Sequence, residues 1–183
     1  MAEEILIRQG APTLAGIKTG SLFPCPCEDR EDLLADIRRL NRRLLPKGLC
    51  LLPIRFLAGQ ALLYLYRPAE LRRDLRDARV SELLRQAGYA NESCARCVVH
   101  LIRRFRESGE FPHEVGLFLS YPPEDVKGFI DHRANGFKCA GLWKAYGDEA
   151  KAQALFAKFK KCTEICCALW QTGSKLEQLA VAV

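Results

Sequence analysis

The stretch from Phe111 to Tyr146 constrains the fold of this chain more than any other part of the sequence. It contains the most strand-like apolar run, Val115–Leu119, which is followed by the Tyr-Pro-Pro start of a helix. An Asn-Gly turn separates this helix from a second apolar segment, FKCAGLWKAY. The order strand, helix, strand is typical of an α/β domain. The connection between the two strands exceeds a dozen residues, which is long enough for them to be parallel.

Hydrophobic periodicity predicts the remaining helices and strands. A hairpin is expected over residues 49–67, with its turn at residues 57–60, and Pro53 places its first strand at an edge or a bulge. Residues 24–27, Pro-Cys-Pro-Cys, are expected to be a loop. Helices are expected over residues 2–9, 29–45, 68–87, 93–107, 123–131 and 148–170, and further strands over 114–121 and 138–146. The sequence therefore predicts an α/β fold in one compact domain, 1–183. Its mixed sheet has about four strands, from hairpin 49–67 and strand–helix–strand 114–146, and is covered by helices.

Composition excludes several classes of protein. The chain has 183 residues and a net charge of +6, and much of that charge lies where arginine alternates with acid at helical spacing. Such alternation is typical of a solvated helix face, so nucleic acid is not an expected partner. No apolar run reaches the roughly 18 residues of a membrane span, and the first residues lack the pattern of a signal peptide. We therefore expect a cytoplasmic protein with no membrane partner.

The carboxyl ends of the two central strands predict a ligand site if those strands are parallel. Tyr121 and Tyr146 then lie at one sheet edge, where two helices begin with backbone N–H groups that can hold an anion. Acidic residues in those first turns would repel an anion, so ordinary helix capping is the alternative. Lysine and arginine side chains would supply counter-charge. The residues expected to bind a small anionic ligand or cofactor are Lys18, Thr19, Arg67, Tyr121, Pro122, Lys127, Tyr146 and Gly147.

A thiol-dependent enzyme is a second hypothesis for the same stretch. With parallel strands, Cys139 falls at the edge of His113 and Glu114, and a thiolate beside a histidine that a carboxylate orients is suited to nucleophilic catalysis. With antiparallel strands, Cys139 moves to the opposite edge. His113 and Tyr121 bracket a strand that rises roughly 3.3 Å per residue, which puts them on the order of 25 Å apart. On this geometry His113 and Tyr121 cannot share one small site.

The nine cysteines suggest a third hypothesis, a metal or iron–sulfur accessory protein. Their number is odd and no secretory signal is expected, so free thiols, metal ligands or core residues are favoured over disulfides. Four cysteines on two helices have some metal-ligand spacing, although they also lie on apolar stripes, which favours structural thiols over a metal site. These four are Cys94, Cys97, Cys162 and Cys166. Cys25 and Cys27 are expected to be exposed and redox-reactive.

Several blocks, APTLAGIKTGSLF, ALLYLYRPAEL, FPHEVGLFLSYPPEDVKGFI and KCAGLWKAYGDEAKAQALFAKFKKCT among them, extend over nearly the full chain. Together they resemble a bacterial family of uncharacterised proteins, a domain of unknown function common in anaerobes. Members usually carry glycine where this chain has Ser120. The resemblance implies no particular activity. The frequent neighbourhood of flavodoxin and iron-uptake genes implies a link to redox or iron metabolism, with a cofactor or metal as ligand and a redox protein as partner.

Overall fold

The computed structural model describes residues 2–90, 93–107 and 109–182. The chain divides into two compact units, which are described separately. The first unit combines Met1–Ala69 with Phe159–Val183, and the second is Glu70–Lys158. The expectation of a single domain over 1–183 remains a prediction.

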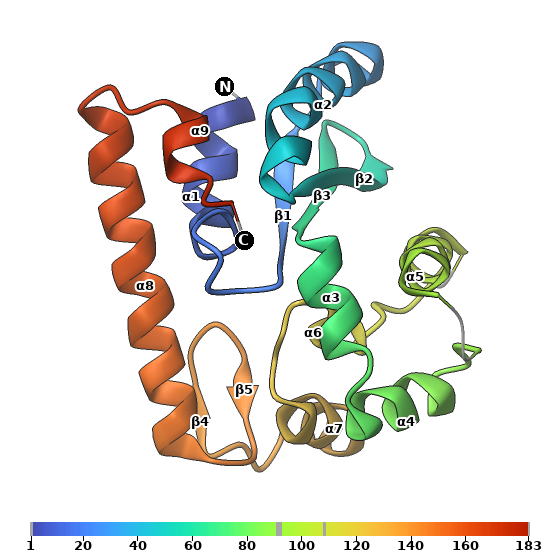
Figure 1. Ribbon diagram of the computed structural model, residues 1–183. Coiled ribbons are helices and arrows are strands. Elements are labelled where there is room, and N and C mark those ends of the chain that lie inside the picture. The colour runs from blue at the N-terminus through green and yellow to red at the C-terminus, as the bar shows by residue number, and fades with distance from the viewer. Residues whose placement is uncertain (1, 91–92, 108, 183) are drawn as a thin grey trace. The chain divides into compact units, whose positions relative to one another are not determined.

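A three-stranded antiparallel sheet in the order β1-β3-β2 forms the centre of the first unit (Figure 1). The elements of this unit are α1 (Ala2–Leu14), β1 (Gly20–Pro26), α2 (Arg30–Leu44), the 3₁₀ helix η1 (Leu45–Lys47), β2 (Cys50–Leu57), β3 (Gln60–Tyr66), the second half of α8 (Glu149–Gln171) and α9 (Leu176–Leu179). The side chain of Asp29 caps α2 by accepting hydrogen bonds from the backbone N–H groups of Glu31 and Asp32. The apolar stripe predicted for α2 is buried in the same core as residues of the three strands.

The core of the first unit combines residues from both ends of the chain. Leu14 of α1, Phe23 of β1, Leu40 of α2 and Leu65 of β3 are all buried in one cluster. Leu176, Leu179 and Ala180 belong to the same cluster. Burial of this apolar surface is the main driving force for folding of the unit, so residues 162–180 complete a core that the first 66 residues begin.

The predicted hairpin is confirmed, whereas the predicted loop at residues 24–27 is wrong. In β2, the register against β3 shifts between Pro53 and Arg55, as expected for a proline on an edge strand. Pro24 and Pro26 belong to β1, which pairs with β3 on one side only. Alternating prolines are compatible with an edge strand, since their missing N–H groups can all face away from the neighbouring strand.

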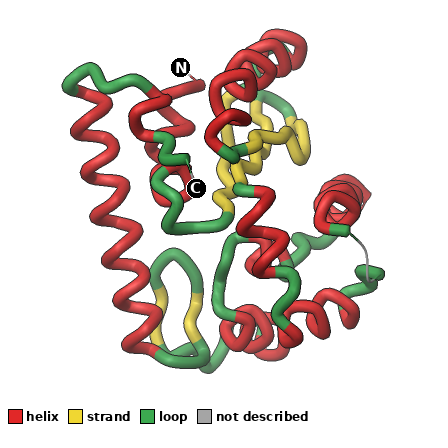
Figure 2. The backbone as a smooth tube through the Cα atoms, in the orientation of Figure 1, coloured by secondary structure: helices red, strands yellow, loops and turns green. Residues whose placement is uncertain are grey.

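The second unit is mainly helical (Figure 2). Its elements are α3 (Pro68–Asp74), α4 (Ala78–Gln86), α5 (Cys94–Glu107), α6 (Val115–Phe118), α7 (Pro123–His132), the two-residue strands β4 (Cys139–Ala140) and β5 (Lys144–Ala145), and the first half of α8. Strands β4 and β5 pair with each other and are antiparallel. The expected α/β class is therefore confirmed, with one three-stranded sheet and one short hairpin among helices. Among the helices of the described residues, none is long and apolar enough to cross a membrane.

The central strand predicted at residues 114–121 is wrong, because this segment contains helix α6. Leu117 N–H donates to the carbonyl of Glu114 at 3.0 Å, and Tyr121 N–H donates to that of Gly116 at 2.9 Å. All residues from Val115 to Leu119 are buried, and a continuous apolar run has the same pattern in a buried helix as in a buried strand. The single strand predicted at residues 138–146 is also wrong, because this segment folds back on itself as the antiparallel hairpin of β4 and β5. The predicted strand–helix–strand unit 114–146 therefore does not form, and its two strands have no parallel pairing.

Candidate functional site

A cavity of about 320 Å³ lies in the second unit where four segments meet. These segments are residues 111–116, Tyr121, helix α7 and the β4–β5 hairpin. We call this cavity the aromatic pocket. The residues that characterise its wall are Phe111, His113, Tyr121, Phe129 and Trp143, together with Asp125 and Lys144.

The rings of the aromatic pocket contact one another in pairs. Tyr121 stacks on Trp143 with ring centres 4.5 Å apart, and His113 meets Phe129 edge to face at 4.9 Å. His113 and Tyr121 therefore line the same cavity. The expectation that they cannot share a small site is wrong, because a helix rises only about 1.5 Å per residue and the chain turns at its end.

Asp125 braces one wall of the pocket. The residue is only 3% exposed, and its carboxylate accepts a hydrogen bond from Trp143 Nε1 at 2.8 Å. The backbone N–H groups of Tyr146 and Gly147 both donate to Asp125 Oδ1 at 2.8 Å. The N–H groups expected to hold an anion near Tyr146 thus donate within the protein, and Asp125 fixes the hairpin against α7.

Lys144 and His113 are the residues of the pocket wall that can carry positive charge. Lys144 Nζ donates to the carbonyl of Ala134 at 3.3 Å and lies 4.7 Å from the centre of the Phe137 ring. The first contact is long for a hydrogen bond and the second is a cation–π contact, so neither holds the ammonium strongly. An anionic group on a ligand could therefore replace the carbonyl as its partner.

The rim of the pocket is apolar. Phe111 and Leu142 line the cavity, and they are 54% and 55% exposed. Exposed apolar side chains gathered at a cavity are typical of a ligand-binding groove.

Tyr121 and Pro122 also line a second cavity of the unit, about 400 Å³ in volume. Its wall carries both signs of charge, including Arg79, Glu124 and Lys151. Arg79 pairs with Glu124 at 3.6 Å, and such an exposed pair contributes little energy. Mixed charge gives this cavity no clear preference for an anion.

The remaining residues of the expected anion site lie in both units. In the second, Lys127 pairs with Asp131 one helical turn away on α7. Tyr146 also lies in the second unit, and its hydroxyl is buried without a hydrogen-bond partner in the described part of the chain. In the first unit, Lys18 lies 5.8 Å from the centre of the Phe159 ring, and burial lowers the pKa of Lys18 to about 8. A site that combines Lys18 with Tyr121 stays a prediction.

Arg67 has a structural role in the first unit. Its side chain is 2% exposed, and its guanidinium donates to backbone carbonyls at distances of 2.7 to 3.2 Å. The acceptors are Thr13, Leu14, Lys47 and Val181. The backbone N–H of Arg67 also donates to the carbonyl of Thr19 at 2.9 Å. Arg67 thus connects α1, η1 and the C-terminal segment.

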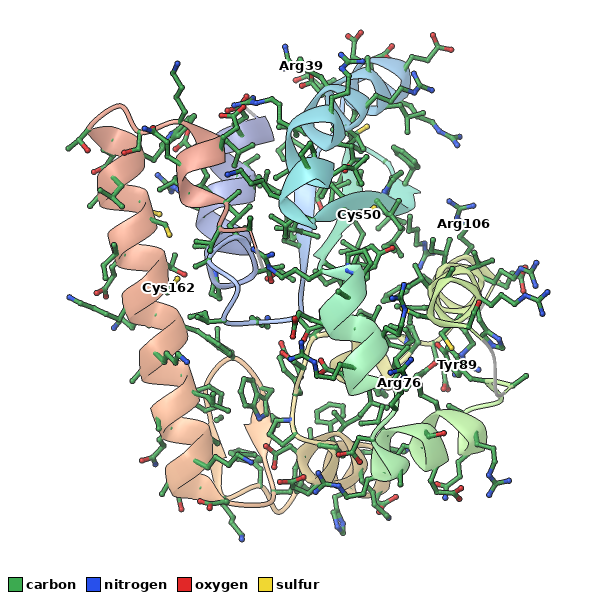
Figure 3. All side chains as sticks on the ribbon, in the orientation of Figure 1. Arg39, Cys50, Arg76, Tyr89, Arg106 and Cys162 are labelled. Atoms are coloured by element: carbon green, nitrogen blue, oxygen red, sulfur yellow. The ribbon has the colours of Figure 1, made fainter. Side chains whose placement is uncertain are left out.

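The residues proposed for thiol catalysis all lie in the second unit, and a thiol-dependent enzyme stays a prediction. Glu114 is buried and accepts hydrogen bonds from Arg104 Nε at 3.0 Å and from Tyr89 Oη at 3.2 Å. Tyr89, labelled in Figure 3, stacks on His100 of α5, so this network turns Glu114 toward α5. The pKa of the Cys139 thiol is raised by desolvation first and then by the charges of Glu149 and Asp125. Within the described residues, no hydrogen bond joins Cys139 to His113.

The helical cysteines do not form a common cluster within either unit. Cys94 and Cys97 belong to α5 in the second unit, whereas Cys162 (Figure 3) and Cys166 belong to the part of α8 in the first. The pKa of Cys166 is raised to about 12, first by burial and then by the neighbouring Cys162, which favours the protonated thiol. Across residues 2–90, 93–107 and 109–182, no three His, Cys, Asp or Glu side chains are grouped to hold a metal ion.

Phe111, Phe129 and Trp143 are the site residues that the sequence analysis missed. The signal that could have found them is the density of aromatic residues between positions 111 and 146, which exceeds that of the rest of the chain. The contacts between these rings depend on helix α6 and on the β4–β5 hairpin. The sequence analysis expected strands in both places, so it could not predict these contacts.

Comparison with known proteins yields a family alone. The family model described as "Protein of unknown function (DUF3793)" matches residues 6–180. No curated protein and no solved structure matches the chain.

Proposed function

Since the chain belongs to the DUF3793 family, whose description assigns no function, we propose from the geometry that it binds a small anionic ligand with an aromatic ring. The proposed site is the aromatic pocket of the second unit. The match confirms the expected family of uncharacterised proteins, whereas a bacterial origin stays a prediction. A link to redox or iron metabolism and a redox partner protein stay predictions.

The size and lining of the pocket support this proposal. Pockets for small molecules have volumes of roughly 300–1,000 Å³ and mainly apolar walls with a few polar groups. The aromatic pocket, at about 320 Å³, is at the small end of that range. Stacked and edge-on rings such as Tyr121, Trp143 and Phe129 are suited to the faces and edges of a planar ligand.

Charge supports an anion as the polar part of the ligand. Both oxygens of Asp125 already accept hydrogen bonds inside the protein, which spreads its negative charge over three donors. Lys144 and His113 remain as donors at the wall. The single observation that carries the proposal is this cavity of converging rings with Lys144 at its edge.

The test uses three naphthalene probes of one shape: 2-naphthoate, neutral 2-naphthalenemethanol and cationic 2-naphthylmethylammonium. Binding is measured by calorimetry and by the fluorescence of Trp143 in a Trp170→Phe background. We expect 2-naphthoate to bind at least about fivefold more tightly than the neutral probe, which corresponds to about 1 kcal/mol from one partly screened charge contact.

Lys144→Met should abolish this preference while binding of the neutral probe is retained. Lys138→Met is the matched control, because Lys138 lies in the same segment and its Nζ donates to the carbonyl of Gly147. Equal affinity for all three probes, or equal effects of the two lysine variants, would contradict the proposal.

A further inference from the structure

Cys25 and Cys27 lie on the same side of the first-unit sheet. Side chains two positions apart on a strand point to one face, with their Cα atoms roughly 6.6 Å apart. Cys27 follows β1 directly, and its N–H donates to the carbonyl of Gly59 at 3.0 Å, so the pairing with the hairpin continues through it. Cys25 belongs to the hydrophobic core and Cys27 packs against that core. The expectation that both thiols are exposed is thus wrong for Cys25, which is 3% exposed.

The two thiols line one cavity of about 450 Å³ between the end of β1 and the start of α2. Four carboxylates line the same cavity, those of Glu28, Asp29, Asp32 and Asp36. Asp29 is occupied as the cap of α2, and Asp36 pairs with the exposed Arg39 at 2.9 Å. The surplus of carboxylates makes the cavity attractive to a cation and unattractive to an anion.

From this juxtaposition we infer that Cys25 and Cys27 bind a soft, thiophilic metal ion of the Cu⁺ class between their two sulfur atoms. Thiolates are the ligands that soft ions select.

The number of available ligands distinguishes this ion from zinc. Structural zinc takes four ligands, and no group of three or more suitable side chains exists in the described residues. A monovalent d¹⁰ ion such as Cu⁺ is satisfied by two thiolates. Each thiol at present makes one weak contact at 3.5 Å, from Cys25 Sγ to the carbonyl of Pro26 and from Cys27 Sγ to that of Asp29. Binding replaces two S–H bonds by two Cu–S bonds, releases two protons to solvent and leaves the copper in its +1 state.

The experiment titrates the anaerobic, fully reduced protein with Cu⁺ in competition with the chromophoric chelator bicinchoninate. The variants are Cys25→Ala and Cys27→Ala, each checked for folding by circular dichroism. Cys27→Ala is the milder change, since Cys27 is only partly buried. The matched control is Cys162→Ala/Cys166→Ala, a pair four residues apart on α8.

We expect the wild-type protein and the α8 control each to bind one Cu⁺ equivalent tightly. Cys25→Ala and Cys27→Ala should each lose this tight equivalent. The affinity for Cu⁺ should fall at least about 100-fold when either thiol is removed. X-ray absorption at the copper edge should report two sulfur neighbours. Retention of the tight site in folded Cys27→Ala, or its loss in the α8 control, would overturn the inference.

Discussion

Asp125 joins more parts of the second unit than any other carboxylate described above. Its Oδ1 accepts two backbone N–H groups, so in Asp125→Asn the amide oxygen keeps that position and the NH₂ group faces Trp143 Nε1–H. The amide NH₂ group and the indole N–H then face each other as two donors with no acceptor between them, in a buried environment. We expect the free energy of unfolding to fall by about 2–3 kcal/mol, measured by urea titration.

The matched test of the Asp125 prediction is a double-mutant cycle. Trp143→Phe removes the indole donor, so Asp125→Asn should cost clearly less in that background than in the wild type. Equal costs in both backgrounds would show that the Trp143 hydrogen bond is not the cause.

Ser120 has a backbone conformation that favours glycine. Its φ angle is +57°, directly after helix α6, and a Cβ in this region costs energy. Glycine, which has no Cβ atom, adopts this conformation without that cost. Ser120→Gly removes this strain, but glycine also makes the unfolded chain more favourable through its greater conformational entropy. The net effect should be a rise of about 0.5 kcal/mol in the free energy of unfolding.

Ser120→Ala is the control for this prediction. It removes the hydroxyl, which donates to the carbonyl of Leu119 at 2.7 Å, but keeps the Cβ atom. Thermal or urea unfolding should show no gain for alanine. A gain equal to that of glycine would mean that the hydroxyl, not the φ angle, is unfavourable.

At the scale of elements, α7 depends on a close approach to the hairpin. A Cβ atom at Gly128 would lie 2.4 Å from Cγ and 2.5 Å from Cβ of Tyr146, which are atoms near the backbone and cannot move aside easily. Alanine would gain about 1 kcal/mol in helix propensity. Overpacking costs about 1–3 kcal/mol. The contacts of 2.4 and 2.5 Å are severe, so we expect the clash to prevail and Gly128→Ala to lower the free energy of unfolding by up to about 2 kcal/mol in urea unfolding.

A second background separates the two effects at Gly128. In Tyr146→Gly both the opposing ring and its Cβ atom are absent, and Gly128→Ala should then stabilise the protein. If alanine still destabilises α7 in that background, the close approach to Tyr146 is not responsible.

The elements that the sequence predicted well are those with a clear period. Helices α2, α5, α7 and α8 lie within a few residues of the expected bounds, because their apolar positions recur at helical spacing. The hairpin of β2 and β3 was equally clear from its turn. These elements follow from local patterns alone.

The elements that the sequence did not predict are those whose conformation depends on distant contacts. The run Val115–Leu119 is apolar on every side, so its period cannot distinguish helix from strand, and Gly116 lets α6 pack closely on Val126. Strand β1 was hidden by Pro24 and Pro26, which are tolerated only because β1 is an edge. The aromatic pocket depends on α6, so its ring contacts could not be predicted without that helix.

At the scale of the whole molecule, one arginine joins the two ends of the chain within the first unit. Arg43 of α2 forms ion pairs with Glu3 of α1 and with Glu177 of α9. Hydrogen bonds from Arg43 lower the pKa of Glu177 from 4.5 to about 2. The ion pair of Glu177 with Arg43 therefore contributes fully to the free energy of unfolding above pH 4.5. This contribution is lost as the pH falls toward 2, because Glu177 is protonated in the unfolded chain at a higher pH than in the folded one.

We therefore expect Arg43→Met to flatten the acid-dependent loss of stability between about pH 4.5 and pH 2.5. The difference should be about 1 kcal/mol or less, because the Glu177 side chain is 37% exposed. Urea unfolding at a series of pH values measures it. Arg39→Met, which removes an exposed pair on the same helix, is the control and should leave the slope unchanged. A slope that is the same in Arg43→Met and the wild type would contradict the prediction.

The division of the first unit between two distant stretches of chain has a consequence for biosynthesis. Residues 70–158 leave the ribosome after β3 and before Cys166, Leu176 and Leu179 can reach the core. At roughly 5–20 residues per second, the nascent sheet waits on the order of ten seconds with its apolar face incomplete. During that interval the second unit can emerge as a continuous piece, while the first unit exposes to solvent the apolar surface that residues 166–180 will later cover.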